Sequence, residues 1–170
     1  MKLWIFPSEN KKNIKIGYDN CMWAVTYVNE ATMKGRHTKA TGLKKGDAGL
    51  LYCSENQSFT VPFLMKSFPE FCMVHDVWPE PWSLPFDIKP LGSPDKFMNL
   101  NTMTHELGIS GNPTFSLNGL NGRTIFVPNK ITDLVWSWIL KNLGSEPASN
   151  AEPLLSPERP READPSASSG

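Results

Sequence analysis

Several features that define large protein classes are scarce in this chain of 170 residues. It has three cysteines, which form no C-x-x-C pair and leave an odd thiol, so neither a disulfide framework nor a zinc ribbon is expected. The three histidines are scattered without an i, i+4 pair, so we expect no metal and no other cofactor. The chain lacks any run of about eighteen apolar residues, so we expect no membrane partner.

The composition fits one folded domain followed by a polar tail. Hydrophobic residues make up 39% of the chain, enough for one sizeable core, which we place in residues 1–143. Residues 144–170 are rich in Pro, Ser, Ala and Glu and have no aromatic residue, which predicts a disordered tail, or a linker to a fused or associated effector domain. The apolar run at residues 1–7 is too short for a signal peptide, so we expect a cytoplasmic protein, or a nuclear one in a eukaryote.

Basic residues are concentrated near the start of the chain, although the formal net charge is zero. Residues 1–45 contain nine Lys or Arg against three acids, a local balance of +6. Such an asymmetry favours a polyanion on one face, while an ordinary solvated surface gives the same pattern. The candidate phosphate contacts are Lys11, Lys12, Arg36 and Lys39.

The apolar pattern predicts an α+β fold, with a curved β-sheet or small barrel and flanking helices. We expect strands at residues 2–7, 21–28, 48–54, 58–66, 86–91, 113–116 and 123–127. A short helix is predicted from Ser8, as its N-cap, through Lys15, with Gly17 as the C-terminal cap. A last helix is predicted at residues 130–142, capped by Asn129.

The remaining segments are predicted from their local chemistry. Residues 29–45 are polar and basic, which indicates a loop able to hold a short helix, and residues 68–85 form an aromatic, proline-rich loop. Pro62 lies inside a predicted strand and indicates a sheet edge or a bulge, because proline cannot donate to the ladder. Trp138 falls on the apolar face of the last helix, so we expect it in the core.

The tryptophans are the residues that suggest a function. Trp23 lies in a predicted strand directly after a polar turn, and Trp78 and Trp82 lie in the loop that leads to another strand. A buried tryptophan usually belongs to the core. Here, however, the polar segment 8–13 supplies a helix N-terminus with free amides, which suits an anion or the edge of a base. Together these segments predict a pocket for a flat ligand.

The order and spacing of these segments resemble the YTH domain, a reader of adenine methylated on its exocyclic amine. Residues 5–14 resemble its "IKS-x4-[ND]-[VI]" motif, residues 22–24 its "VW[ASC]" motif, and residues 77–82 its "VWxxxKW" loop, with the two tryptophans four residues apart instead of five. Residues 45–54 are similar to the "KxGDxxxxYxS" strand of EVE domains. Both families belong to the PUA-like superfamily, which also contains N-terminal modules of methyl-directed McrB-type restriction proteins.

The resemblance, which covers residues 3–143, implies a tryptophan cage for the methylated base. Trp23 and Trp82 would flank the methyl group, Trp78 would close the cage, and Asn13 would bind the base edge. The base must be single-stranded or flipped out to enter such a cage. The implied base-binding set is Ser8, Glu9, Asn13, Trp23, Ala24, Trp78 and Trp82.

Three hypotheses of different classes follow. The favoured one is a non-catalytic reader of methyladenine in RNA or DNA, with a DNA specificity module of a restriction protein, reading another modified base such as methylcytosine, as the alternative. The second is an enzyme acting on a nucleotide or small molecule, but the sequence offers no nucleophile–base pair, paired carboxylates or metal spacing, so we expect no enzyme. The third is a protein-interaction module that uses the Pro- and Trp-rich loop.

Overall fold

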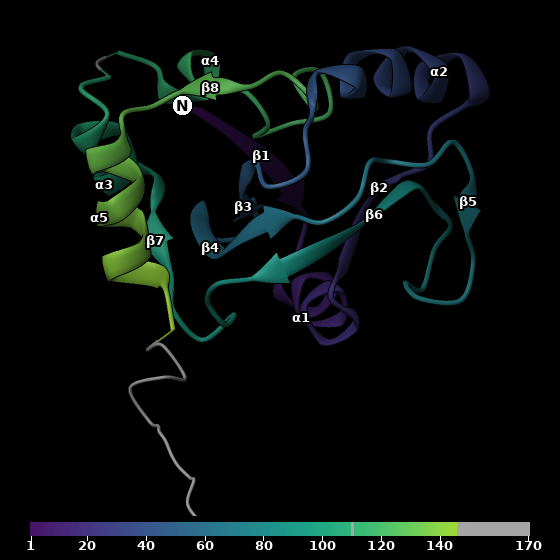
Figure 1. Ribbon diagram of the computed structural model, residues 1–170, viewed down its shortest axis with the longest axis horizontal. Coiled ribbons are helices and arrows are strands. Elements are labelled where there is room, and N and C mark those ends of the chain that lie inside the picture. Colours follow the sequence, from purple (N-terminus) through teal and green to yellow (C-terminus); the bar gives the residue numbers. More distant parts are fainter. Residues whose placement is uncertain (110, 146–170) are drawn as a thin grey trace, which may run out of the picture.

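The computed structural model describes residues 1–109 and 111–145 (Figure 1). Most of the predicted tail, residues 146–170, lies outside the described residues. The elements in chain order are β1 (Lys2–Ser8), α1 (Lys11–Asn20), β2 (Met22–Thr26), α2 (Glu30–Lys39), a 3-10 turn (Ala40–Gly42), β3 (Ala48–Cys53), β4 (Ser58–Met65), β5 (Met73–Val74), β6 (Trp82–Pro90), β7 (Met98–Asn99), α3 (Leu100–Glu106), α4 (Pro113–Ser116), β8 (Asn129–Lys130) and α5 (Asp133–Leu143).

The predicted α+β fold is confirmed, and its strands form one open mixed sheet of eight strands. The order is β2-β6-β4-β3-β1-β8, with β5 beside β6 and β7 beside β4. β1 and β3 run parallel and the other pairs run antiparallel. Because parallel strands end on the same side, Ser8 of β1 lies opposite Cys53 of β3 at one edge of the sheet.

The sheet separates two apolar clusters, because side chains of a strand alternate between its faces. In β1, Trp4 and Phe6 join the cluster that α1 and α2 cover, whereas Leu3 and Ile5 join the cluster that α3 and α5 cover. Figure 1 shows α3 and α5 on one side of the sheet, with α1 and α2 placed away from them. Trp23, Trp78 and Trp82 all belong to the first cluster.

The first helix differs from its prediction at both ends. Ser8 remains in β1, and Asn10 is the N-cap, its side chain accepting from the Asn13 N–H at 2.8 Å. Gly17 lies inside the helix, which continues to Asn20 before Cys21 takes the left-handed conformation with φ of 51°.

Gly17 is therefore explained by packing and not by capping. A Cβ atom at this position would lie 2.5 Å from Cε3 of Trp23 and 2.9 Å from the carbonyl oxygen of Met22. Only a residue without a side chain lets α1 approach β2 this closely, so Gly17 sets the position of the Trp23 ring.

Two predictions about the middle of the chain have clear outcomes. The predicted neighbours 48–54 and 58–66 pair as β3 and β4. Leu50 pairs with Pro62 and Leu51 with Thr60, which leaves Val61 between them unpaired, with φ of 48°, so the predicted bulge is confirmed. Segment 29–45 contains more helix than expected, since α2 spans ten residues. The side chain of Asn29 caps α2, and Met33 is its one buried residue, which explains why the apolar pattern was weak.

The C-terminal third departs most from prediction. Residues 113–116 form the short helix α4, and residues 123–127 form turns, because asparagine side chains and turn hydrogen bonds organise both segments locally. Helix α5 begins at Asp133 with Thr132 as its cap, since Asn129–Lys130 pair with β1 as β8. Trp138 is half-buried and packs against the second apolar cluster, in which Ile139 is completely buried, so Trp138 lies at the rim of the core and not inside it as predicted.

None of the helices in residues 1–109 and 111–145 is both long and apolar enough to cross a membrane.

Candidate functional site

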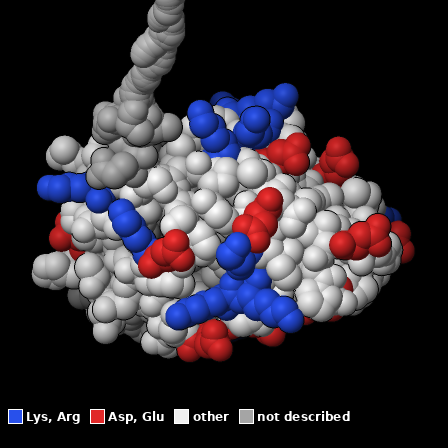
Figure 2. Space-filling model, turned by 90° about the horizontal axis from the view of Figure 1, so that it is seen from below, with Lys and Arg blue, Asp and Glu red and all other residues white. Residues whose placement is uncertain are grey.

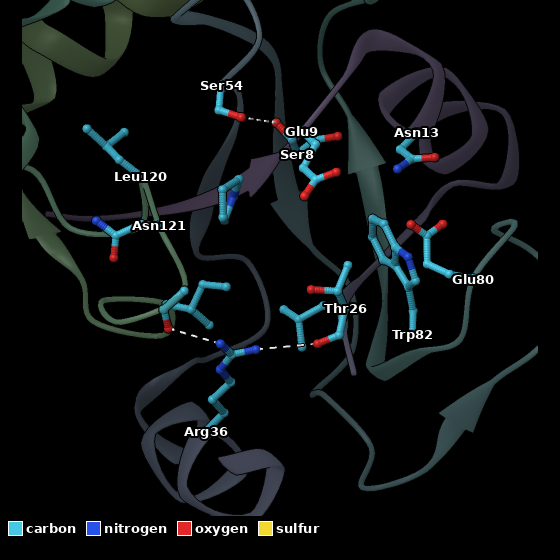
Figure 3. A pocket seen from close by; sticks show the side chains of 14 residues that line it. Ser8, Glu9, Asn13, Thr26, Arg36, Ser54, Glu80, Trp82, Leu120 and Asn121 are labelled. Atoms are coloured by element: carbon cyan, nitrogen blue, oxygen red, sulfur yellow. Dashed lines mark hydrogen bonds between the residues drawn. The ribbon is translucent and has the colours of Figure 1, made fainter. Parts of the chain in front are cut away.

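A cavity of about 320 Å³ opens where β1, α1 and β2 meet the loop that precedes β8 (Figure 3). It lies at the edge where the parallel strands β1 and β3 end, a common position for ligand sites in such sheets. The lining residues are Pro7, Ser8, Glu9, Asn13, Val25, Thr26, Arg36, Ser54, Glu80, Trp82, Leu120, Asn121, Gly122 and Ile125. Four residues of the predicted base-binding set are thus together around one cavity: Ser8, Glu9, Asn13 and Trp82.

Hydrogen bonds fix the strand-end side of the cavity. The Ser8 hydroxyl donates to the Asn10 carbonyl at 2.8 Å, and Ser54 donates to the Ser8 carbonyl from its backbone N–H at 2.8 Å and its hydroxyl at 3.3 Å. These bonds tie the start of α1 to the end of β3, so the polar wall is held by both parallel strands. Glu9, next to this wall, is exposed.

Asn13 supplies an amide to the cavity from the first turns of α1. Asn13 is buried, and its side chain makes no hydrogen bond within the described part of the chain. The backbone carbonyl oxygen of Asn13 accepts a hydrogen bond from the indole N–H of Trp78 at 3.0 Å. The side-chain amide therefore keeps both a donor and an acceptor for a ligand in the cavity.

The three tryptophans form a closed cluster. The rings of Trp78 and Trp82 are stacked, with centroids 4.1 Å apart and planes 5° from parallel. Trp23 meets both rings edge to face, at 5.7 Å from Trp78 and 5.1 Å from Trp82. All three are at most 2% exposed. Stacked rings at this separation are already in van der Waals contact, so a base does not fit between them.

Trp82 is the member of the cluster that borders the cavity, and Trp23 and Trp78 do not line it. It is placed by β6, which begins at Trp82 and not at Phe86 as predicted. The buried indole N–H groups of Trp23 and Trp82 have no hydrogen-bond partner among the described residues. An unpaired buried donor costs about 1–3 kcal/mol, and such costs are typical of sites kept for function.

Ala24 is buried next to the cluster and does not line the cavity. The pairing of β2 with β6 shifts register between Trp23 and Val25, so Ala24 falls at the irregularity. A residue at such a bulge is left outside the regular ladder, which is how main-chain groups become available to a ligand.

The opposite wall of the cavity contains Arg36, predicted as a phosphate contact, together with Asn121 and Gly122, which the sequence analysis did not select. Arg36 reaches from α2 to donate to the Gly122 carbonyl at 3.1 Å and to the Thr26 carbonyl at 3.5 Å (Figure 3). Burial lowers the pKa of the half-buried Arg36 guanidinium. Asn121 and Gly122 belong to an Asn-Gly turn visible in the sequence, but nothing local indicated that it would meet α2.

Glu80 also lines the cavity without having been predicted, and it adds a second carboxylate to that of Glu9. It lies between the two loop tryptophans and is exposed. In Figure 3, Glu9 and Glu80 lie on the same side as Asn13 and Trp82, and Arg36 and Asn121 lie across the cavity from them. The cavity thus has an acidic and aromatic side facing a basic and polar side. We find no cluster of three or more metal-binding side chains within the described ranges.

The four predicted phosphate contacts fall in two places. Lys11 and Lys12 are exposed on α1, with the Lys11 ammonium 4.8 Å from the Phe97 ring, and neither lines the cavity. Arg36 and Lys39 lie on α2, and Arg36 does line it. On the face seen from below in Figure 2, one group of basic side chains lies at the lower centre and another at the top, with acidic side chains between and beside them.

No family model matches the chain, and no curated protein matches it. Among solved structures, it is similar to the YTH domain of the Zygosaccharomyces rouxii MRB1 protein in complex with N6-methyladenosine RNA, with 15% identity, a TM-score of 0.53, and coverage of 82% of this chain and 84% of that one. It is also similar to the apo YTH domain of Toxoplasma CPSF4, with 16% identity, a TM-score of 0.49, and coverage of 85% and 89%. The likeness to the MRB1 domain shows that this chain has a YTH-like fold.

Proposed function

We propose that this domain binds RNA and captures an adenine methylated on its exocyclic amine in the cavity beside Trp82. The observation that carries the proposal is that one cavity is lined by the indole of Trp82, by Asn13 and by Ser8 at the end of β1. The YTH-like fold supports it, since the MRB1 domain of that fold was solved with N6-methyladenosine RNA.

The chemistry of the walls suits a flat base with a polar edge. The base would stack on the indole of Trp82, because every base offers a π-face to an aromatic ring. Asn13 would pair with the base edge as both donor and acceptor, since adenine presents ring nitrogens that accept and an exocyclic N–H that donates. Main-chain groups at Ala24 and Ser8 would bind the remaining polar atoms.

Binding of the methyl group requires the tryptophan cluster to open. We infer that Trp78 leaves the stack and that the base takes its place against Trp82. The movement breaks the hydrogen bond from Trp78 to Asn13, about 0.5–1.5 kcal/mol net, and two aromatic pairs, with Trp82 and with Trp23, of about 0.5–1.5 kcal/mol each. A stacked base returns about 1–3 kcal/mol, so it offsets part of this loss.

Because stacking of the base offsets only part of this loss, the contacts of the methyl group decide whether binding is favourable. An unmethylated adenine would leave methyl-sized space against the rings, and such a difference contributes on the order of 1–3 kcal/mol. We therefore expect methyl selectivity of roughly ten- to one-hundred-fold, with a larger share of the total affinity coming from phosphate contacts.

The test is fluorescence-anisotropy binding of the chain to matched single-stranded oligonucleotides with and without one N6-methyladenine, as RNA and as DNA. We expect tighter binding of the methylated RNA and loss of that preference in Trp82→Phe, a smaller ring that keeps an apolar side chain. Trp136→Ala, a half-buried tryptophan on α5, is the matched control and should keep the preference.

Equal affinity for methylated and unmethylated RNA in the unaltered protein would overturn the proposal. A preference confined to methylated DNA would overturn the choice of polymer.

A further inference from the structure

A second cavity, of about 540 Å³, adjoins the first. It lies between α2 and the turn at residues 121–123. It shares Arg36, Asn121 and Gly122 with the first cavity, beside Trp82, which we call the base cavity. Its other lining residues are Thr32, Gly35, Lys39 and Arg123. Three of the seven lining residues are cationic and none is acidic, which suits an anion, and we name this cavity the α2 groove.

The charges of the α2 groove are not neutralised by carboxylates. The ion pair found in the described part of the chain joins Lys15 and Asp19 of α1, and neither residue lines this groove. Arg36 instead donates to the carbonyls of Thr26 and Gly122, which are neutral acceptors. A guanidinium has five N–H donors, and those not used by the carbonyls remain for a further acceptor. A charged acceptor such as phosphate forms a stronger bond than a carbonyl.

Two glycines shape the groove. A Cβ atom at Gly122 would lie 2.7 Å from Nη2 of Arg36, so the missing side chain lets the guanidinium reach the turn. At Gly35, in contrast, an added Cβ would meet nothing within 4 Å. The helix surface at Gly35 is therefore open, and a ligand can approach the backbone of α2 there.

The opposite side of the base cavity disfavours an anion. Glu9 and Glu80 line that side, so a phosphate placed there would meet two carboxylates. Like charges at such a site cost free energy, whereas Arg36, Lys39 and Arg123 attract the same phosphate on the α2 side.

We propose that the α2 groove binds the RNA phosphates that adjoin the captured base. The strand then leaves the base cavity across Arg36 and runs between α2 and residues 121–123, and it does not follow Lys11 and Lys12 on α1. This strand path rests on the proposed function, because it takes the base cavity as the fixed end of the strand.

The first experiment measures the salt dependence of binding to a single-stranded RNA with one N6-methyladenine. The slope of log K against log salt is negative, and each phosphate contact removed from a single strand reduces its magnitude by about 0.7. Below, a lower slope means a smaller magnitude. Lys39→Gln and Arg123→Gln should each lower the slope by about that amount and weaken methylated and unmethylated RNA by the same factor. Lys11→Gln and Lys12→Gln, exposed lysines of the other helix, should leave the slope unchanged.

The second experiment adds a charge without removing a contact. Gly35→Glu places a carboxylate in the α2 groove at a position with open space, so the fold should tolerate it while RNA binding weakens at low salt. Gly35→Ala is the matched control and should bind as the unaltered protein does.

A third arm locates the phosphates along the strand. In oligonucleotides with one uncharged methylphosphonate linkage, the loss should be largest at linkages next to the methyladenine and should disappear in Arg123→Gln.

The strand path is wrong if the α1 variants lower the slope while the α2 variants do not, or if Gly35→Glu binds normally. A monophosphate of N6-methyladenosine that binds as tightly as the oligonucleotide would also overturn it. Groove-dependent binding without any methyl preference would instead overturn the proposed function and leave the phosphate site standing.

Discussion

The two sides of the base cavity are built differently. On the aromatic side, Trp82 is buried against Trp23 and Trp78, and Gly17 brings α1 into contact with the Trp23 ring. On the polar side, Arg36 crosses from α2 to the turn at residues 121–122 through two hydrogen bonds, at the edge of open space.

This difference indicates which wall defines the shape of the site and which wall adapts to a ligand. Close-packed aromatic rings tolerate almost no change in volume, so Trp23 and Trp82, which remain in contact when Trp78 leaves the stack, fix the position of a bound base. An arginine held by two neutral carbonyls can exchange them for a charged group at little cost. We therefore expect substitutions on the aromatic side to affect stability and those on the polar side to affect binding.

The largest effect is expected for Trp23→Ala. The ring is completely buried and contacts both other tryptophans, so its removal should lower the free energy of unfolding by about 3–5 kcal/mol. Urea unfolding followed by circular dichroism measures this loss. A loss below 1 kcal/mol would show that the aromatic side is not the rigid one.

Gly17→Ala should have the next largest effect. The new methyl group would collide with the Trp23 ring and the Met22 carbonyl, and overpacking of this kind costs about 1–3 kcal/mol. The gain in helix propensity from alanine, up to about 1 kcal/mol, is too small to compensate. Thermal unfolding should show a lower midpoint, and an unchanged midpoint would contradict the close contact of α1 with β2.

Arg36→Gln tests the polar side. Losing the two bonds to carbonyls should lower stability by only about 1 kcal/mol, because the side chain is half-buried and water replaces the lost partners. RNA affinity at low salt should fall by much more than this loss of stability implies. Titration calorimetry at two salt concentrations would separate the two effects, and equal losses would remove the contrast between the walls.

Gly35→Ala has the smallest expected effect, and its sign is opposite. No atom lies within 4 Å of the added methyl group, so the change should raise stability by about 0.5–1 kcal/mol through helix propensity alone. Measured beside Gly17→Ala in the same unfolding assay, it compares two helical glycines that differ only in their surroundings. Destabilisation at Gly35 would mean that α2 packs more tightly than described.

The sequence predicted those parts of the fold that local patterns determine. Runs of apolar residues predicted β1, β3 and β4, and proline chemistry predicted the bulge at Pro62. Gly17 was misread as a cap, because the rule for helix ends is local and the Trp23 ring that demands glycine lies in another element. Helix α2 was underestimated because a helix that buries only Met33 has almost no apolar periodicity.

The candidate site follows the same division. Ser8, Asn13 and Trp82 were predicted because they lie near motifs that can be read from the chain. The contact of Arg36 with Gly122 joins residues 86 positions apart, and no local pattern predicts such an approach. The stacking of Trp78 on Trp82 was missed for a related reason, since a spacing of four residues does not specify how two indoles will face each other.

The tryptophan stack also makes the domain its own optical probe. Two indoles that lie parallel at 4.1 Å, with a third ring edge-on to both, couple their electronic transitions and give ultraviolet circular dichroism that isolated indoles lack. If Trp78 leaves the stack when a base enters, that signal changes without any label on the protein or the RNA. The circular dichroism of the stacked tryptophans would then follow the binding of a ligand that separates Trp78 from Trp82, in real time.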